Sequence, residues 1–174
     1  FEGISDEAYA EMYLFIHDFL GSYGYEHYEV SNWSRAGFRS RHNLAYWEGK
    51  PYVGLGPSAH SYISPYRWWI KPDLREYIEN LHERQILSIE VEKIGKREAV
   101  LEWFMLRFRL SEEISWSDIP LSQDALQALS FCISSWADRG WIRVSPRGIS
   151  ILPYGWLWLD TILKEVLDIV HHAA

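Results

Sequence analysis

The side chains with the clearest chemical potential lie close together, at His42, Asn43, Tyr46 and Trp47. Read as a helical turn, the segment pairs His42 with Tyr46 and Asn43 with Trp47, because residues four apart are neighbours on one helix face. That face carries an imidazole, which can ligate a metal, beside two large flat rings, so it could bind a planar cofactor. The alternative is a loop histidine hydrogen-bonded to the backbone, with Tyr46 and Trp47 packed as anchors.

A predicted strand over Tyr25–Ser31 leads into this motif. Alternate residues of a strand point to the same side, so His27, Glu29 and Ser31 share one face. Glu29 and Ser31 stand near the end of the strand and could line a cavity. The alternative is a pair of hydrogen-bonded interior residues without a ligand, and His27 is expected to be structural.

A glycine-containing bend follows the motif. Gly54-Leu55-Gly56-Pro57 lacks the third glycine of a dinucleotide-binding fingerprint, so it predicts a backbone bend or a close approach where no side chain fits. His60 comes directly after the bend and is a second-rank candidate site residue.

The remaining pattern of residues 1–92 is typical of an α/β unit. Apolar residues at three- and four-residue steps predict a helix over Ser5–Leu20, ended by Gly21 and Gly24. Residues 32–50 read as a long connection. Further elements are extended segments at 52–55, 59–63 and 66–70, and a helix from Pro72, in its first turn, to about Arg84.

Residues 93–174 have a different character and predict a second, mostly helical domain. A helix predicted over 100–108 is apolar on nearly all sides, so we expect it to be buried. Ser122 is a suitable cap for a second helix that ends at Gly140, followed by a hairpin over 141–152 and a last helix through Val170. Helix, helix, hairpin and helix is a winged-helix-like order.

Composition excludes several classes of protein. The net charge of -7 works against binding to phosphate backbones, and the helix after Ser122 has no Lys or Arg before Arg139, so no nucleic-acid partner is expected. The single cysteine, Cys132, excludes a disulfide framework within the chain and any all-protein thiolate cluster. No apolar run reaches the ~18 residues of a membrane span and no signal peptide is evident, so a cytoplasmic protein is expected. The chain opens at Phe1 without an initiator Met, which suggests a piece of a longer protein.

Three blocks in this order resemble the late part of the radical-SAM coproporphyrinogen-oxidase-like family: residues 28–33 (YEVSNW), 42–47 (HNLAYW) and 52–61 (YVGLGPSAHS). The resemblance implies the C-terminal part of a partial (β/α) barrel over 1–92, followed by the family's helical C-terminal domain over 93–174. Members hold a 4Fe-4S cluster on three cysteines and bind S-adenosyl-L-methionine. The His-Asn-x-x-Tyr-Trp block is similar to that of the haem chaperone branch, which transfers haem to client haemoproteins.

The resemblance assigns roles to particular residues. His42 would ligate the haem iron, Asn43, Tyr46 and Trp47 would contact the haem, and Glu29, Ser31 and His60 would line the cavity. The loop arginines Arg35, Arg39 and Arg41 could meet the propionates of a tetrapyrrole, although a solvated loop is the simpler account of any one of them.

The chain departs from the family pattern in two places. Cys132 alone cannot supply three cluster ligands, so the cluster and most of the S-adenosyl-L-methionine site must belong to a missing N-terminal half, and the chain alone should be inactive in radical chemistry. Residues 152–158 (LPYGWLW) stand where family members are expected to have a helix start that contains Ser-Asn. This departure affects how the last helix would pack, and it does not affect the His-Asn-x-x-Tyr-Trp block. Two alternatives stay open: a fragment of an oxygen-independent coproporphyrinogen III oxidase, and a cofactor-free winged-helix interaction module.

Overall fold

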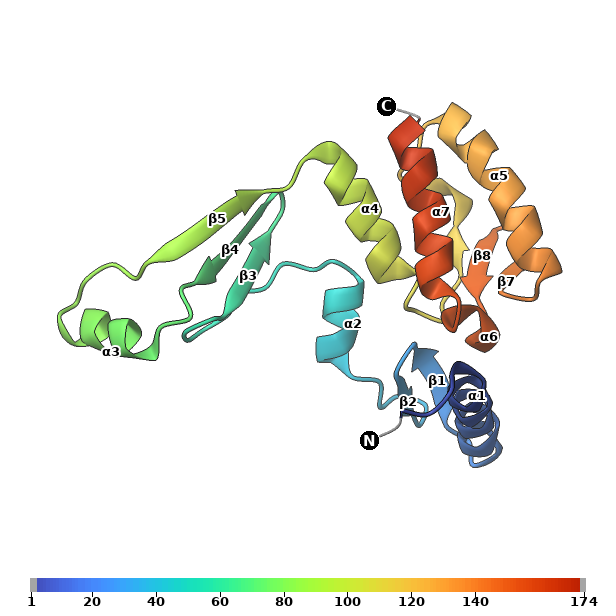
Figure 1. Cartoon of the computed structure of the whole chain (residues 1–174), viewed down its shortest axis with the longest axis horizontal. Coiled ribbons are helices and arrows are strands. Elements are labelled where there is room, and N and C mark those ends of the chain that lie inside the picture. Colours follow the sequence, from blue (N-terminus) through green and yellow to red (C-terminus); the bar gives the residue numbers. More distant parts are fainter. Residues whose placement is uncertain (1–2, 173–174) are drawn as a thin grey trace. The chain divides into compact units, whose positions relative to one another are not determined.

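The computed structural model describes residues 3–172, which divide into two compact units (Figure 1). One unit comprises Phe1–Glu48 and Val100–Ala174, and the other Gly49–Ala99. The sequence-based boundary at residue 92 falls inside a strand of the second unit, Ile89–Lys93. The assignment of 1–92 to a barrel and of 93–174 to a separate domain stays a prediction.

The first unit begins with helix α1 (Asp6–Ser22) and a short hairpin. Ser5 caps α1 by accepting a hydrogen bond from the Ala8 N–H at 3.2 Å, which satisfies a donor that the first turn leaves free. Strands β1 (Glu26–Glu29) and β2 (Asn32–Ser34) pair antiparallel, with an irregularity between His27 and Glu29. The predicted strand over 25–31 therefore ends earlier than expected, because the chain turns at Val30 and Ser31.

The expected long connection at 32–50 is wrong in part, because it holds two regular elements. Strand β2 occupies its start, and helix α2 (Arg41–Trp47) contains the His-Asn-x-x-Tyr-Trp block. The Ser40 side chain caps the start of this seven-residue helix by accepting from the Asn43 N–H. The prediction that the block forms a helical turn is confirmed.

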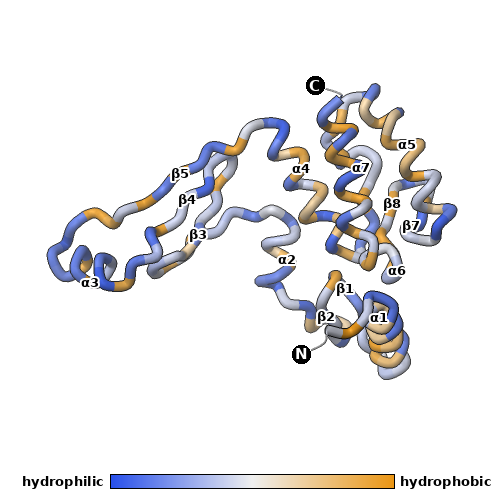
Figure 2. The backbone as a smooth tube through the Cα atoms, in the orientation of Figure 1, coloured by the Kyte–Doolittle hydropathy of each residue, from blue (hydrophilic) through white to orange (hydrophobic). Residues whose placement is uncertain are grey.

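The C-terminal part of the same unit contains the core. Its elements are α4 (Lys96–Arg107), β6 (Ile114–Ser115), the 3-10 helix η1 (Trp116–Asp118), α5 (Gln123–Asp138), β7 (Ile142–Val144), β8 (Gly148–Ile151), α6 (Pro153–Trp156) and α7 (Leu159–His172). The predicted Ser122 cap, the hairpin and the last helix are confirmed. Side chains from α4, α5 and α7 meet the three-stranded sheet, of order β6-β8-β7, in one apolar cluster. Figure 1 shows these elements, and Figure 2 shows the hydropathy along their backbone.

Strand β6 was not predicted from the sequence, and it is the third strand of the winged-helix-like sheet. It pairs with β8 at Ile114↔Ile149 and Ser115↔Gly148. A Cβ at Gly148 would lie 1.9 Å from the Ile114 carbonyl oxygen, so only glycine permits this approach. The expectation that the helix at 100–108 is buried all round is correct only in part, since Phe104 and Phe108 are buried but Met105 is exposed.

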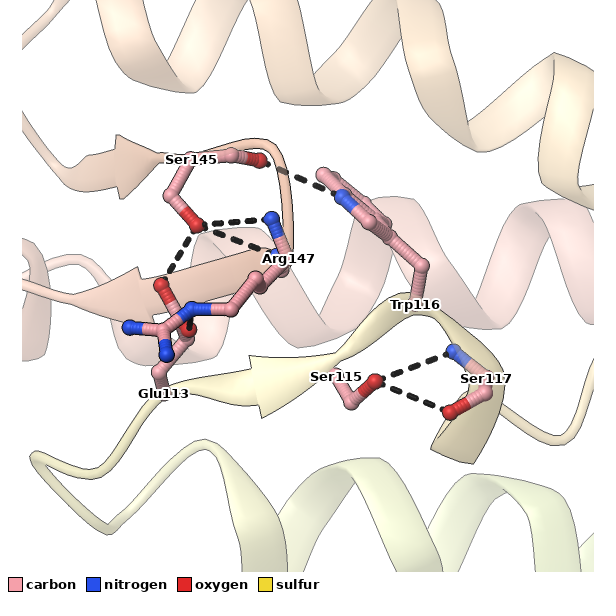
Figure 3. A network of polar contacts seen from close by, with 7 residues as sticks. Glu113, Ser115, Trp116, Ser117, Ser145 and Arg147 are labelled. Carbon is pink, nitrogen blue, oxygen red and sulfur yellow. Dashed lines mark hydrogen bonds and ion pairs between the residues drawn. The ribbon is translucent and has the colours of Figure 1, made fainter.

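A polar network fixes the turn between β7 and β8 (Figure 3). The Ser145 hydroxyl donates to Glu113 at 2.5 Å and accepts from the Arg147 and Gly148 N–H groups at 3.0 and 3.1 Å. The Trp116 indole N–H donates to the Ser145 carbonyl at 3.2 Å. These polar side chains satisfy the turn itself, so their contacts give no indication of a ligand.

The second unit is a three-stranded antiparallel sheet with one helix. Strands β3 (His60–Ile63), β4 (Tyr66–Ile70) and β5 (Ile89–Lys93) pair in the order β3-β4-β5, and helix α3 (Leu74–His82) connects the last two. Strand β5 was not predicted. Asp73, not Pro72, begins α3, because its carboxylate accepts from the Glu76 N–H at 2.9 Å. No helix among residues 3–172 is long and apolar enough to cross a membrane.

Candidate functional site

Helix α2 is the element that carries the candidate site, and its own sequence fixes its start. The Ser40 side chain accepts a hydrogen bond from the Asn43 N–H at 3.3 Å, and the Leu44 N–H donates to the Ser40 carbonyl at 3.0 Å. Asn43 therefore takes part in the cap through its backbone, which leaves its side chain amide available. The helix presents the motif residues from one short, capped segment.

The His42 ring is exposed and lies edge-on to Tyr46. Their ring centroids are 4.8 Å apart and the planes meet at 85°, as the four-residue spacing predicts. Neither His42 ring nitrogen has a hydrogen-bond partner among residues 3–172. This does not support the alternative of a histidine bound to backbone, and it leaves an imidazole that can ligate a metal from solvent.

Trp47 anchors the other end of α2 against a residue distant in the sequence. The Arg109 guanidinium lies over the Trp47 ring, 5.1 Å from its centroid. The Arg109 carbonyl accepts a hydrogen bond from the Val30 N–H at 2.8 Å, so the same residue also joins the turn after β1. The sequence reading missed Arg109, because no spacing rule connects it to the motif.

Glu29 and Ser31 have different surroundings, although the alternation of a strand places them on one face. Glu29 is completely buried, and its carboxylate accepts hydrogen bonds from the Asn32 side chain amide and, at 3.3 Å, from the Ser31 N–H. Its oxygens therefore serve the turn that follows β1. This geometry favours the structural alternative for Glu29, and its role as a cofactor-binding residue stays a prediction.

Ser31 lies at a separate cleft of about 350 Å³ between α1 and the turn after β1. The cleft is lined mainly by apolar and aromatic side chains, namely Tyr9, Met12, Tyr13, Ile16, Val30, Trp33, Trp156 and Leu157. None of the four motif residues of α2 lines it.

His27 belongs to an aromatic cluster, which fits its expected structural role. Its ring stacks on Trp33 with centroids 4.0 Å apart, and its Nδ1 lies 3.1 Å from the Nδ1 of His17. Burial, with a further contribution from His17, lowers the pKa of His27 from 6.5 to about 4. The ring is therefore neutral at pH 7. The Tyr13 hydroxyl donates to the Val30 carbonyl at 2.8 Å and holds α1 against the same turn.

His60 lies in the second unit, where it stacks on Trp69 with ring centroids 5.4 Å apart. The predicted close approach at Gly54 is confirmed, because a Cβ there would lie 2.2 Å from the His60 carbonyl oxygen. The glycine thus fixes the backbone of His60, while the side chain is exposed.

The loop arginines differ in how far their charges are satisfied. Arg39 forms ion pairs with Glu26 at 3.1 Å and with Glu112 at 2.7 Å, so its charge is balanced within the protein. Arg35 lies over the Tyr25 ring at 5.5 Å, and Arg41 is an exposed residue in the first turn of α2. These contacts weaken the expectation that Arg39 meets a propionate.

The donors present do not fit an iron-sulfur cluster, whereas they do fit a single iron held by one imidazole. No group of three or more His, Cys, Asp or Glu side chains that could hold a metal occurs in the described part of the chain. The sequence contains one cysteine, so this chain cannot supply the ligands of a 4Fe-4S cluster. The exposed imidazole of His42, which has no hydrogen-bond partner among residues 3–172, would hold the iron of a haem.

Comparison with solved structures defines the fold class. The chain resembles the radical-SAM enzyme coproporphyrinogen III oxidase from Escherichia coli, with a TM-score of 0.62 over 86% of this chain and 38% of that one, at 16% identity. The fold is that of the C-terminal part of a coproporphyrinogen-oxidase-like radical-SAM protein. No protein-family model matches the chain.

Curated relatives place the chain more narrowly. It is 33% identical to the haem chaperone HemW of Synechocystis over 79% of this chain, and 36% identical to HemW of Mycobacterium tuberculosis over 62%. HemW of Haemophilus influenzae is 27% identical over 93%. The chain spans 34%, 27% and 43% of these proteins, about a third of their length. The chain is a HemW-like segment, as the resemblance of its motifs indicated.

Proposed function

We propose that this chain is the haem-receiving part of a haem chaperone, which binds haem at α2 and passes it to client haemoproteins. The observation that carries the proposal is the exposed His42 ring, whose nitrogens have no hydrogen-bond partner among residues 3–172. The chaperone names of the relatives support the same function.

Each motif residue has a chemical part in the proposed site. His42 would hold the haem iron through an imidazole nitrogen. Tyr46 lies edge-on to His42 and limits the rotation of the imidazole, because its ring is in contact at 4.8 Å. Asn43 and Trp47 are four residues apart and therefore neighbours on one face of α2. Both would contact the rim of the macrocycle. Ser31 is a cavity residue in this proposal, and Glu29 shapes the turn beside it by accepting from the Ser31 N–H at 3.3 Å. His60 is a separate candidate contact in the second unit.

The rest of the longer protein supplies the radical-SAM parts. The 4Fe-4S cluster and S-adenosyl-L-methionine belong to an N-terminal half, because this chain has only Cys132. When bound there, they supply one-electron chemistry, which the present residues do not perform. We propose that this half packs on the apolar side chains that α1 leaves exposed, including Phe15 and Phe19.

A haem titration followed at the Soret band tests the proposal. The protein and the variants His42→Ala and His82→Ala are titrated with haem. His82 is the matched control, because it is an exposed histidine on a helix of the second unit. We expect a Soret shift in the protein and in His82→Ala, and a changed spectrum with weaker binding in His42→Ala.

Transfer is tested by adding apomyoglobin, as an acceptor of defined affinity, to the haem-loaded protein. Movement of haem to the acceptor faster than its spontaneous release supports a chaperone role. An unchanged Soret shift in His42→Ala removes the proposed ligand. No binding of haem at all, either to this chain or to the longer protein, supports the cofactor-free interaction module instead.

A further inference from the structure

The Arg109 guanidinium lies beside α2 and has no role in the haem site proposed above. Its guanidinium lies 5.1 Å from the Trp47 ring centroid, and its backbone carbonyl is fixed by the Val30 N–H at 2.8 Å. The side chain also donates from Nε to the Met105 carbonyl at 3.1 Å. The Nε end of the guanidinium is thus held in place, while its two terminal NH₂ groups have no hydrogen-bond or ion-pair partner among residues 3–172.

The charge of Arg109 is not balanced by a carboxylate. Among residues 3–172 it forms no ion pair, whereas Arg39 in the same unit is paired with both Glu26 and Glu112. A guanidinium with a free pair of NH₂ groups matches the geometry of a carboxylate, which can accept two parallel hydrogen bonds. Of these two cations, Arg109 is therefore the one available to an anionic ligand.

Trp47 adds a second donor at the same place. Its Nε1 is buried and has no hydrogen-bond acceptor in the described part of the chain. A buried donor without an acceptor costs about 1–3 kcal/mol, which a ligand that supplies the acceptor can recover. The guanidinium and the indole N–H are thus unsatisfied donors on two stacked side chains, and both prefer an anionic oxygen.

We propose that Arg109, with the Trp47 indole N–H, binds a propionate carboxylate of the tetrapyrrole whose iron is held by His42. This inference rests on the proposed haem binding and names the part of the ligand that the site recognises. His42 and Trp47 are separated by about 7.5 Å along the axis of α2, at ~1.5 Å per residue, and by about 140° around it, so the two side chains hold separate parts of the ligand. The iron lies at the centre of the macrocycle and the propionates extend from its edge. The group that binds the iron and the groups that bind a propionate must therefore be separated.

The test compares haem with haem dimethyl ester, which keeps the iron and the ring but lacks both carboxylates. Affinities for the two ligands are measured in the protein, in Arg109→Gln and in Arg139→Gln. Arg139 is the matched control, because it also lies over a tryptophan, 4.8 Å from the Trp141 ring centroid, but on a different segment. Near-ultraviolet circular dichroism checks that each variant is folded.

We expect Arg109→Gln to weaken haem binding by about 10- to 100-fold, as for loss of a charge-assisted hydrogen bond. The same variant should bind the ester as the unmodified protein does, and the unmodified protein should bind the ester about as weakly as Arg109→Gln binds haem. Arg139→Gln should bind both ligands normally. Arg109→Lys, which keeps the charge but loses the bidentate geometry, should fall between the two.

Three results would overturn the inference and are distinguishable from one another. If Arg109→Gln loses affinity equally for haem and for the ester, Arg109 only holds Trp47 in place and does not bind a carboxylate. Equal affinity of the unmodified protein for haem and ester leaves haem binding intact but removes propionate recognition, and this comparison needs no variant. Absence of haem binding removes the proposed function itself, and the inference with it.

Discussion

Helices α1 and α5 are nearly equal in length, at 17 and 16 residues, and each begins with a serine cap, yet their surroundings differ. Helix α5 buries Ala125, Leu129, Ile133 and Trp136, whereas α1 buries no residue. Both sequences are amphipathic (Figure 2). Amphipathicity thus indicates that a helix has a face to bury but does not identify what covers that face. On α1, Phe15 and Phe19 stay 66% and 48% exposed.

The attachment of the two helices differs in kind. Trp136 of α5 is completely buried and also donates a hydrogen bond to Glu165 of α7 at 2.7 Å, so the helix is held by a packed core. Helix α1 is held mainly by polar and aromatic contacts at its inner edge, among them the Tyr13 hydroxyl and the His17–His27 pair. We expect α1 to be the less stable of the two helices.

The largest effect is expected in the α5 core. Ile133→Ala should lower the free energy of unfolding by about 2–4 kcal/mol, because it removes buried methyl groups and leaves a cavity. Urea unfolding followed by circular dichroism measures this change. A loss below about 1 kcal/mol would contradict the description of α5 as the packed helix.

The next effect concerns the turn that joins β1 to the core. Glu29→Ala should cost about 1–3 kcal/mol, because it leaves the Asn32 amide and the Ser31 N–H without their acceptor. Glu26→Ala is the matched control on the same strand, since Glu26 forms only an exposed ion pair and should cost less than about 1 kcal/mol. Similar costs for both variants would show that the burial of Glu29 does not matter.

A pH-dependent effect is expected at the edge of α1. The pKa of His27 is lowered from 6.5 to about 4, so the stability that its neutral ring contributes is complete above about pH 6.5 and is lost as the pH falls toward 4. His17 and the Tyr13 hydroxyl face this ring from α1, and Tyr13 does not titrate in this range. The contribution should be about 1–2 kcal/mol, discounted because the ring is only partly buried.

Urea unfolding of the protein and of His27→Gln at pH 7 and pH 4.5 measures this contribution. The difference between the two proteins should shrink at the lower pH, since only the unmodified protein must protonate His27 on unfolding. A difference that stays constant with pH would assign His27 to packing alone.

The smallest effect is expected on the outer face of α1. Phe15 is 66% exposed, compared with 8% for Ile133, so Phe15→Ala should change the stability of this chain by less than about 0.5 kcal/mol. The higher helix propensity of alanine offsets part of the lost contact. In a longer protein that includes the N-terminal half, the same variant should cost about 1–3 kcal/mol, because the face is then covered. An equal cost in both contexts would contradict packing of that half on α1.

Local signals in the sequence predicted the elements whose stability is local. Ser5 and Ser122 cap helices through bonds within three residues, and the four-residue spacing of His42 and Tyr46 places their rings in contact. Strands β5 and β6 were missed because they pair with distant strands and are short or rich in charged residues. Arg109 was missed for the same reason, since only the folded chain brings it to Trp47.

The central claim is that His42 holds haem iron on α2, and vibrational and magnetic spectra of the ferric complex test it most directly. Resonance Raman and electron paramagnetic resonance spectra of the haem complex should have the signature of an axial imidazole in the protein and in His82→Ala. That signature should disappear in His42→Ala and return when free imidazole is added. An axial imidazole signature that is unchanged in His42→Ala would contradict the account.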